Sequence, residues 1–252
     1  MDTRIGTEKC FSFINSQAQP PPAGFSGQTP TKLAVTLSRE TGSGALIVAE
    51  KLVDILQARA PAEGRPWTVF DRNLVERVLE DHHLPAKLAR FMPEDRVSAI
   101  EDMMQELLGL HPSSWDLIHQ TTETILKLAE LGNVILVGRG STVITAKLPH
   151  VFHVRLVGSL ERRVERVQEY LKLSHRDAVG FVDREDKGRR RYLREHFHVD
   201  LSDPLLYHLV INTDLISCED AAQIIGEAVL KLRAECSLGE HLARRLTSMA
   251  LH

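Results

Sequence analysis

A short glycine turn, Gly42-Ser43-Gly44, separates an apolar run from a segment whose apolar residues recur at helical spacing. In a parallel α/β sheet, a turn between a strand and a helix presents backbone N–H groups and the positive end of the helix dipole to an anion. A phosphate group suits this chemistry. Because such short glycine motifs often occur by chance, a plain tight turn explains these three residues about as well.

The residues around this turn depart from the usual phosphate-loop pattern, G-x-x-x-x-G-K-S/T. Arg39 stands where the first glycine of the pattern would be, Ala45 at the lysine position and Leu46 at the serine or threonine position. The chain therefore lacks the lysine that bridges the β and γ phosphates and the hydroxyl that binds Mg²⁺. Arg39 is a candidate substitute for the lysine, although a solvated arginine would be equally ordinary.

Other candidates for anion binding follow along the chain. Asp71 and Arg72 end an apolar run at 67–71, and Arg139 lies between two glycines after the run NVILV. The carboxyl ends of parallel strands form the edge at which open α/β sheets bind ligands. A helix-capping Asp71 beside a solvated Arg72 is the competing interpretation.

A dense charge run extends from Arg184 to Arg194. Its cations, offset by Glu185 and Asp186, are Arg184, Lys187, Arg189, Arg190, Arg191 and Arg194. The guanidinium fork matches phosphate geometry well. Taken alone, such a run is more often a solvated helix face.

Alternating strands and helices position these residues. The predicted strands are KLAVTLS from Lys32, 67–71, NVILV at 133–137, 151–158 and 208–214. The predicted helices are 45–60, 73–81, 159–173 with Ser159 as N-cap, and 217–235 with Ser217 as N-cap. This order predicts an α/β fold with a doubly wound, five-stranded parallel sheet.

The chain divides into three parts. Residues 1–30 are predicted to be a flexible leader, because the stretch AQPPPAGFSGQTP packs poorly. Residues 31–235 form the α/β domain, in which 85–131 is a helical insertion and 183–200 a separate charged segment. Residues 236–252 are predicted to be a C-terminal tail.

Composition excludes several classes of protein. The 252 residues carry 31 Lys and Arg against 34 Asp and Glu, and the net charge of −3 argues against a nucleic-acid binder or a protein that coats an anionic membrane. No apolar run approaches the ~20 residues of a spanning helix, and no signal peptide is recognisable. Three cysteines without CxxC spacing indicate neither a disulfide framework nor a zinc site, so a cytoplasmic location is the simplest expectation. The twelve histidines lack metal-binding spacing, and metal ligands cannot be assigned.

Five ordered segments resemble the cytidylate kinase-like family. Between about Lys32 and Val229 they are SRETGSGALIVAEKL, VFDRNLV, GRGSTVITAKLPHVFHVRLVGSLERRVERV, DREDKGRRRYL and YHLVINTDLIS. The resemblance implies a P-loop NTPase-like three-layer sandwich with a mobile basic lid at 183–200. It also implies a phosphotransferase that uses ATP and Mg²⁺ to phosphorylate a nucleoside monophosphate or a related acceptor.

The same resemblance implies three groups of site residues. Those that bind the phosphates of the donor nucleotide are Gly42, Ser43 and Gly44, and Arg39 joins this group as the candidate substitute for the lysine rather than through the resemblance. Those that bind the acceptor are Asp71, Arg72 and Arg139. The catalytic residues of the lid are Arg184, Arg190 and Arg191. Family enzymes carry an Asp where this chain has Gly140, so the resemblance does not extend to cytosine selectivity.

A second function remains open. The losses at Ala45 and Leu46 would also fit a nucleotide-binding regulatory or interaction module that kept the fold without efficient catalysis. Small-molecule nucleotides are the expected partners in both cases. The acceptor and the oligomeric state are not fixed by the sequence.

Overall fold

The structure is a computed structural model that describes residues 33–59, 66–71 and 116–250, together with Phe13, Ser16, Ile100, residues 102–104, Glu106 and Leu107. For residues 116, 117 and 235–250 it describes only the course of the backbone.

Five apolar runs form one parallel sheet, as predicted. The strands are β1 (Ala34–Arg39), β2 (Thr68–Phe70), β3 (Val134–Val137), β4 (Val151–Val157) and β5 (Leu209–Asn212). They lie in the order β2-β3-β1-β4-β5, and every neighbouring pair is parallel. β1 is central and its first five residues are buried, as expected of a strand that is covered on both faces. The glycine turn therefore follows the central strand of the sheet.

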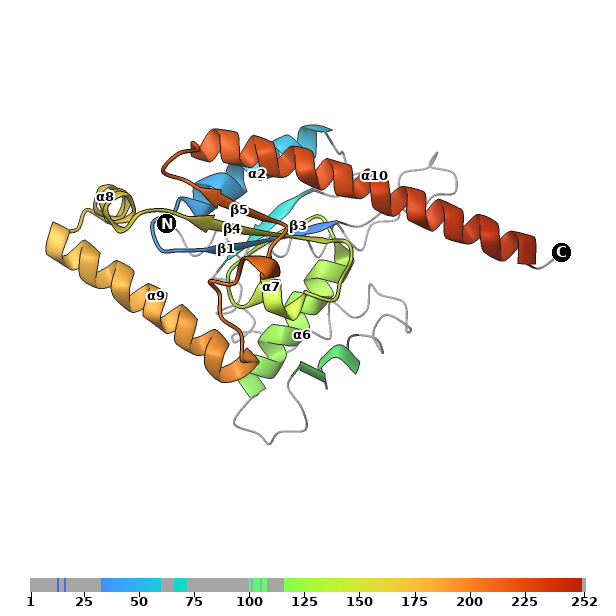
Figure 1. The fold of residues 1–252 in the computed structure, drawn as a ribbon, viewed down its shortest axis with the longest axis horizontal. Coiled ribbons are helices and arrows are strands. Elements are labelled where there is room, and N and C mark those ends of the chain that lie inside the picture. Colours follow the sequence, from blue (N-terminus) through green and yellow to red (C-terminus); the bar gives the residue numbers. More distant parts are fainter. Residues whose placement is uncertain are drawn as a thin grey trace.

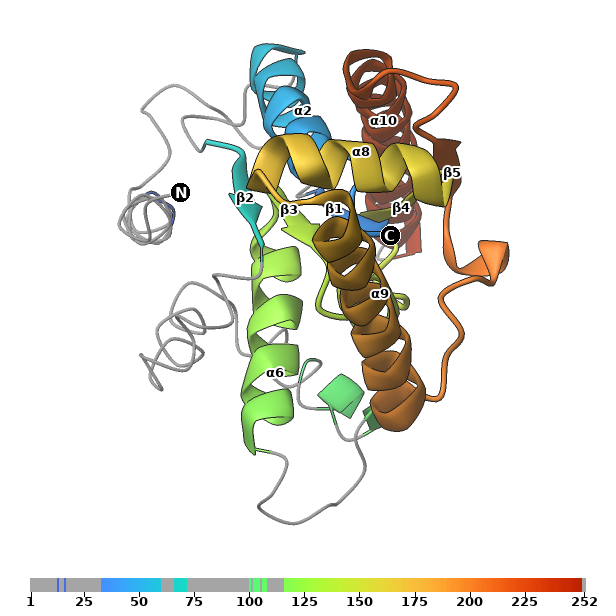
Figure 2. The same cartoon turned by 90° about the vertical axis from the view of Figure 1, so that its left-hand side faces the viewer.

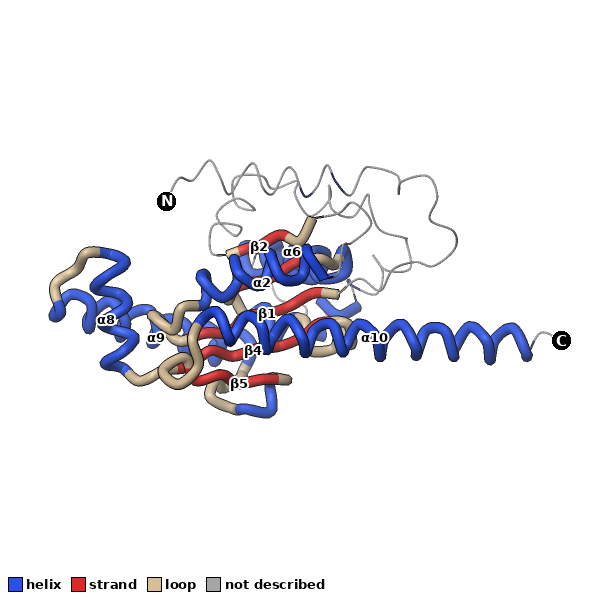
Figure 3. Tube along the Cα trace, turned by 90° about the horizontal axis from the view of Figure 1, so that it is seen from above, coloured by secondary structure: helices blue, strands red, loops and turns tan. Residues whose placement is uncertain are grey.

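Helices cover both faces of the sheet and complete a three-layer sandwich. Figure 1 shows α2 (Ala45–Arg59) and α10 (Cys218–Ala250) on one face, with α6 (Asp116–Leu131) and α7 (Ser141–Ile144) on the other. Seen from above, α2 and α10 run side by side over the strands (Figure 3). The α/β fold class predicted from the sequence is confirmed.

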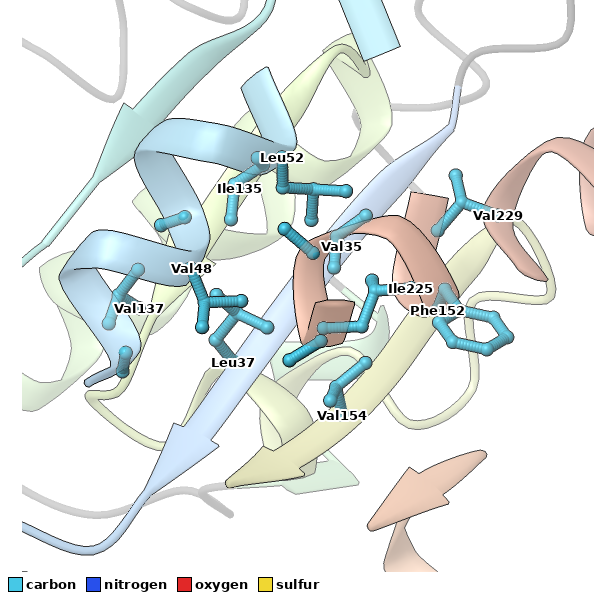
Figure 4. Close-up of a cluster of buried hydrophobic side chains, with 14 of the residues drawn as sticks. Val35, Leu37, Val48, Leu52, Ile135, Val137, Phe152, Val154, Ile225 and Val229 are labelled. Atoms are coloured by element: carbon cyan, nitrogen blue, oxygen red, sulfur yellow. The ribbon is translucent and has the colours of Figure 1, made fainter. Parts of the chain in front are cut away.

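Apolar side chains between the layers hold the sandwich together. On the α2 and α10 face, Val48 and Leu52 of α2 and Ile225 of α10 lie over Val35 and Leu37 of β1, all of them buried (Figure 4). The first five residues of β1 and all four residues of β3 are buried, so these two strands are covered on both faces. This core fixes the loops that follow the strands.

Two further helices lie beyond the carboxyl ends of the strands. These are α8 (Leu160–Leu171) and α9 (His175–Phe197), and the short 3-10 turn Pro204–Leu206 follows them. Ser159 caps α8 as predicted, because its side chain accepts a hydrogen bond from the Arg162 N–H at 3.4 Å. Figure 2 shows α8 crossing in front of the sheet, with α9 extending downward from it to the right of α6. The segment 183–200 begins within α9 and runs past its end.

Some predicted elements differ from the structure or fall outside it. The predicted helix at 73–81 and most of the insertion at 85–131 lie outside the described residues, although α6 forms the end of that insertion. α10 continues to Ala250, through most of the segment predicted to be a separate tail. No described helix is long and apolar enough to cross a membrane.

Phe13 is an exception to the prediction of a flexible leader. Its side chain is fully buried in the core on the α6 face, and its ring lies edge-on to Phe70 with centroids 5.4 Å apart. The Pro-rich composition of residues 18–30 gives no indication of this contact. The sequence signal was the short apolar cluster CFSFI at 10–14.

We expect Phe13→Ala to destabilise the protein by about 3 kcal/mol, because removing a buried ring loses contacts and leaves a cavity. For a chain of this size the melting temperature should fall by roughly 6–12 °C. Leu205→Ala is the matched control, since Leu205 is 90% exposed. If both variants melt with the wild type in calorimetry, residues 1–30 behave as an unattached leader.

Candidate active site

A cleft of about 430 Å³ opens between the carboxyl edge of the sheet and α9. Its volume lies within the usual range of small-molecule sites. One wall is formed by the end of β1 and by the residues that come after β3. The opposite wall is a face of α9. The arginines that line it are Arg39, Arg139, Arg184, Arg189 and Arg191. Glu185 and Glu195 also line it, so the lining carries an excess of positive charge and favours an anion.

Arg39 lies against the backbone of Gly138 in the loop after β3. A Cβ atom built on Gly138 would come within 1.6 Å of Arg39 Nη1, and Gly138 has a φ of +82°. Only glycine allows both this approach and this conformation. The glycine at 138 therefore makes room for the guanidinium of Arg39.

The Arg39 guanidinium is held in an electrostatically unfavourable place. Burial, followed by the charges of Arg189 and Arg139, lowers its pKa to about 10. The carboxylates of Asp71 and Glu185 oppose this shift. Arg39 still carries its charge at neutral pH, and an anion in the cleft would relieve the repulsion among the three cations.

Arg139 occupies a strained position beside Arg39. Its φ is +56°, and the flanking Gly138 and Gly140 also have positive φ. A non-glycine residue in the left-handed region costs about 1 kcal/mol or more and is common at functional sites. The turn thus directs Arg139 into the cleft at the expense of backbone strain.

Behind the cleft wall, the side chains of Thr36, Thr142 and His153 form an uncharged hydrogen-bonded cluster. Thr36 Oγ1 is 3.0 Å from the hydroxyl of Thr142, which lines the cleft, and 2.8 Å from His153 Nδ1. Burial, with a smaller contribution from His208, lowers the pKa of His153 to about 4. The imidazole is therefore neutral at neutral pH and adds no charge to the site.

The three predicted lid arginines do not all face the cleft. Arg184 and Arg191 line it from α9, seven residues apart and hence on one face of the helix. Arg190 lines a separate surface depression with Lys187, Arg191 and Arg194. The structure brings two of the three together, and it adds Arg189, which was not selected as a site residue from the sequence.

The predicted glycine turn does not line this cleft. Ser43 is fully buried and donates from Oγ to the Glu40 carbonyl at 2.8 Å. A Cβ on Gly42 would lie 2.3 Å from the Arg163 carbonyl oxygen, and one on Gly44 would lie 2.6 Å from Cys218 Sγ. α8 and the start of α10 therefore pack directly on the turn, next to the cleft.

The predicted acceptor residues are only partly described. Asp71 follows β2, and its charge acts on Arg39, although it does not line the cleft. Arg72 lies outside the described residues. Arg139 is the predicted acceptor residue that the structure places in the cleft.

The residues present offer no preformed Mg²⁺ cage. Within the described ranges, no group of three or more His, Cys, Asp or Glu side chains could hold a metal ion. Leu46 replaces the usual hydroxyl ligand and is 40% exposed. Because Mg²⁺ in phosphate sites keeps waters and phosphate oxygens as ligands, an ion here would not need a protein cage, and we assign no protein ligand to it.

Comparison with known proteins finds similarity to one family and to curated proteins of the same kind. Residues 34–215 match the cytidylate kinase-like family. The cytidylate kinase of Pyrococcus horikoshii is 27% identical over 169 residues, which are 66% of this chain and 83% of that protein. The cytidylate kinase of Pyrobaculum islandicum is 33% identical over 100 residues, 39% of this chain and 53% of that protein.

One solved structure has a similar fold. The crystal structure of an uncharacterized protein from Eubacterium ventriosum superposes with a TM-score of 0.54 at 17% identity, covering 79% of this chain and 99% of that one. At this identity the likeness concerns the fold alone.

Proposed function

Because the chain belongs to the cytidylate kinase-like family, we propose that it transfers the γ-phosphate of ATP to a nucleoside monophosphate. The observation that carries the proposal is the arginine-lined cleft at the carboxyl edge of the sheet. Phosphoryl transfer demands little covalent chemistry from a protein, which must align two phosphates and offset the charge between them. Five arginines in the lining of one cleft suit that task.

The cleft suggests separate tasks for its two walls. Arg39 is at the end of β1 and Arg139 in the loop after β3, both at the edge of the sheet, so they would hold ground-state phosphates in place. Arg184 and Arg191 come from α9, an exposed helix outside the sandwich. They would approach the transferred group when α9 closes, and would stabilise the charge that develops on it.

Arg39 would take over the task of the missing lysine. Ala45, at the lysine position, has only a methyl side chain, so no cation reaches the phosphates from there. Arg39 instead places a guanidinium in the cleft near Arg139 and Arg189, whose charges lower its pKa. A planar fork can bind two phosphate oxygens at once, which a lysine cannot do.

A nucleotide-binding module without efficient catalysis is the second candidate. It is favoured by Leu46 at the hydroxyl position and by the close packing of α8 on the glycine turn. Under this candidate, ATP and a monophosphate would bind in the same cleft without reacting.

The lid arginines separate the two candidates. We expect Arg184→Ala and Arg191→Ala each to lower kcat about 100-fold with little change in ATP affinity, because contacts made mainly in the transition state affect the rate. Arg190→Ala is the matched control on the same helix and should lose less than about threefold, since Arg190 does not line the cleft.

Steady-state kinetics and calorimetric binding of ATP on the same proteins make this measurement, at two salt concentrations to separate screened attraction from specific contacts. An equal loss in all three variants would contradict the division of α9 into two faces. Binding without turnover in the wild type would favour the binding module.

A further inference from the structure

The carboxylate of Asp186 lies on the backbone that leads into the glycine turn. Asp186 Oδ1 accepts from the Thr41 N–H at 2.8 Å and from the Thr41 hydroxyl at 2.6 Å. The same oxygen accepts from Arg189 Nη1 at 2.9 Å, and Oδ2 accepts from Arg163 Nη1 at 2.7 Å. A main-chain N–H, a hydroxyl and two guanidinium groups thus converge on one small anion.

Most of these donors are held by contacts other than Asp186. Arg163 is buried and also donates from Nε to the Gly158 carbonyl at 2.9 Å and from Nη1 to the Thr41 carbonyl at 3.1 Å. Arg189 Nη1 is 2.6 Å from Thr41 Oγ1, and Nη2 donates to Glu185 at 3.3 Å. The donor set is therefore built by the turn, α8 and α9 together, and would persist around another anion.

Asp186 is an ionised carboxylate between the donors of Thr41, Arg163 and Arg189. Burial alone would raise its pKa, but the hydrogen bonds from Thr41 and the Arg163 guanidinium outweigh burial and hold the pKa below its usual value. The side chain is only 13% exposed. A carboxylate has the planar pair of oxygens that an edge of a phosphoryl group also presents, so the two anions can use the same donors.

We propose that Thr41, Arg163 and Arg189 form an oxyanion site for one phosphoryl group, which Asp186 fills as an internal substitute until a ligand displaces it. Displacement removes the Asp186 contacts between α9 and the turn, while Arg189 still joins α9 to Thr41, so binding of the anion is coupled to the position of α9. The oxyanion site stands on the geometry alone. Identifying its ligand as a phosphate of the donor nucleotide rests on the proposed function.

The test is the affinity for inorganic phosphate of the full chain with Asp186→Ala. Calorimetry should show at least tenfold tighter phosphate binding than in the wild type, because no internal carboxylate has to leave. Added phosphate should also raise the melting temperature of the variant more than that of the wild type. Asp183→Ala is the matched control: it removes the same charge from α9, but Asp183 pairs with exposed Lys187 away from the turn.

Asp186→Asn is the second variant, since its amide oxygen still accepts from Thr41 while the favourable charge toward Arg163 is lost. We expect the same direction of change as in Asp186→Ala. Phosphate affinity equal to that of Asp183→Ala at matched ionic strength would overturn the proposal. Failure of both variants to fold even with phosphate present would also overturn it, because phosphate would then not replace the carboxylate.

The same titrations of the wild type and Asp186→Ala with ATP and with AMP separate this proposal from the proposed function. A gain for ATP but not for AMP would place a donor phosphate in the site. A gain for inorganic phosphate alone would leave the oxyanion site standing while counting against the assignment of its ligand to a nucleotide.

Discussion

Arg39→Met is expected to weaken nucleotide binding at least 100-fold while leaving the protein as stable as the wild type. The loss follows from removing the central guanidinium of the cleft: two charge-assisted hydrogen bonds to a phosphate are worth about 3 kcal/mol together, or roughly 100-fold in Kd. Stability should not fall, because burial and the charges of Arg189 and Arg139 already disfavour the Arg39 cation. Sites of this kind commonly sacrifice stability for function.

Calorimetric titration with ATP and with a monophosphate, alongside thermal melting, measures both effects. Arg162→Met is the control, since Arg162 is 66% exposed and pairs with Glu165 on the outer side of α8. It should leave both affinities unchanged. An Arg39→Met variant that binds both nucleotides normally would show that the cleft does not hold their phosphates.

Gly42→Ala is expected to destabilise the protein by about 3 kcal/mol and to abolish phosphotransfer. The φ of +83° disfavours alanine by about 1 kcal/mol, and the new Cβ would lie 2.3 Å from the backbone carbonyl of Arg163. Because a backbone atom cannot rotate away, α8 has to shift. That shift would move Arg163 from Thr41 and Asp186, so the anion site would be lost together with the packing.

Gly44→Ala is the matched comparison. Its φ of +81° imposes a similar backbone cost, but the new Cβ would meet only the Cys218 sulfur, a side-chain atom that can change rotamer. Its melting temperature should therefore fall by less than half as much as that of Gly42→Ala. Equal losses in the two variants would mean that packing of α8 on the turn contributes nothing beyond the backbone strain.

Much of the fold was predictable because its elements are encoded locally. The run Val134–Val137 reads as a strand covered on both faces, and all four residues are buried. Ser159 reads as an N-cap, and its side chain makes the expected bond to the Arg162 N–H. The parallel direction of the strands also follows from the alternation of strands and helices, whereas their order was not predicted: β3 lies between β1 and β2.

The anion site was not predictable to the same degree, because it depends on how helices face a distant turn. Arg162 and Arg163 are adjacent and chemically alike, yet the first side chain is 66% exposed and the second 10%. Only the rotation of α8 against Gly42 decides which of them reaches Thr41 and Asp186. Periodicity gives the faces of a helix, and it does not tell which face meets which loop.

Helical spacing in the sequence already distinguishes the three predicted lid arginines from one another. Arg184 and Arg191 are seven residues apart and share a helical face, whereas Arg190 is offset by about 100° from Arg191. Helical spacing alone therefore separates Arg190 from the other two. Which of the two faces points to the cleft depends on the position of α9 across the cleft from the ends of β1 and β3, and helical spacing does not give that position.

The central claim is phosphotransfer in the arginine cleft, and transfer of a labelled phosphate tests it most directly. The full chain would be incubated with Mg²⁺, ATP labelled at the γ position and each common nucleoside monophosphate in turn, with Arg39→Met as the background. We expect the label to appear in a nucleoside diphosphate for at least one acceptor and to fall about 100-fold with the variant. Binding of ATP and of the monophosphates without any labelled diphosphate would contradict the account.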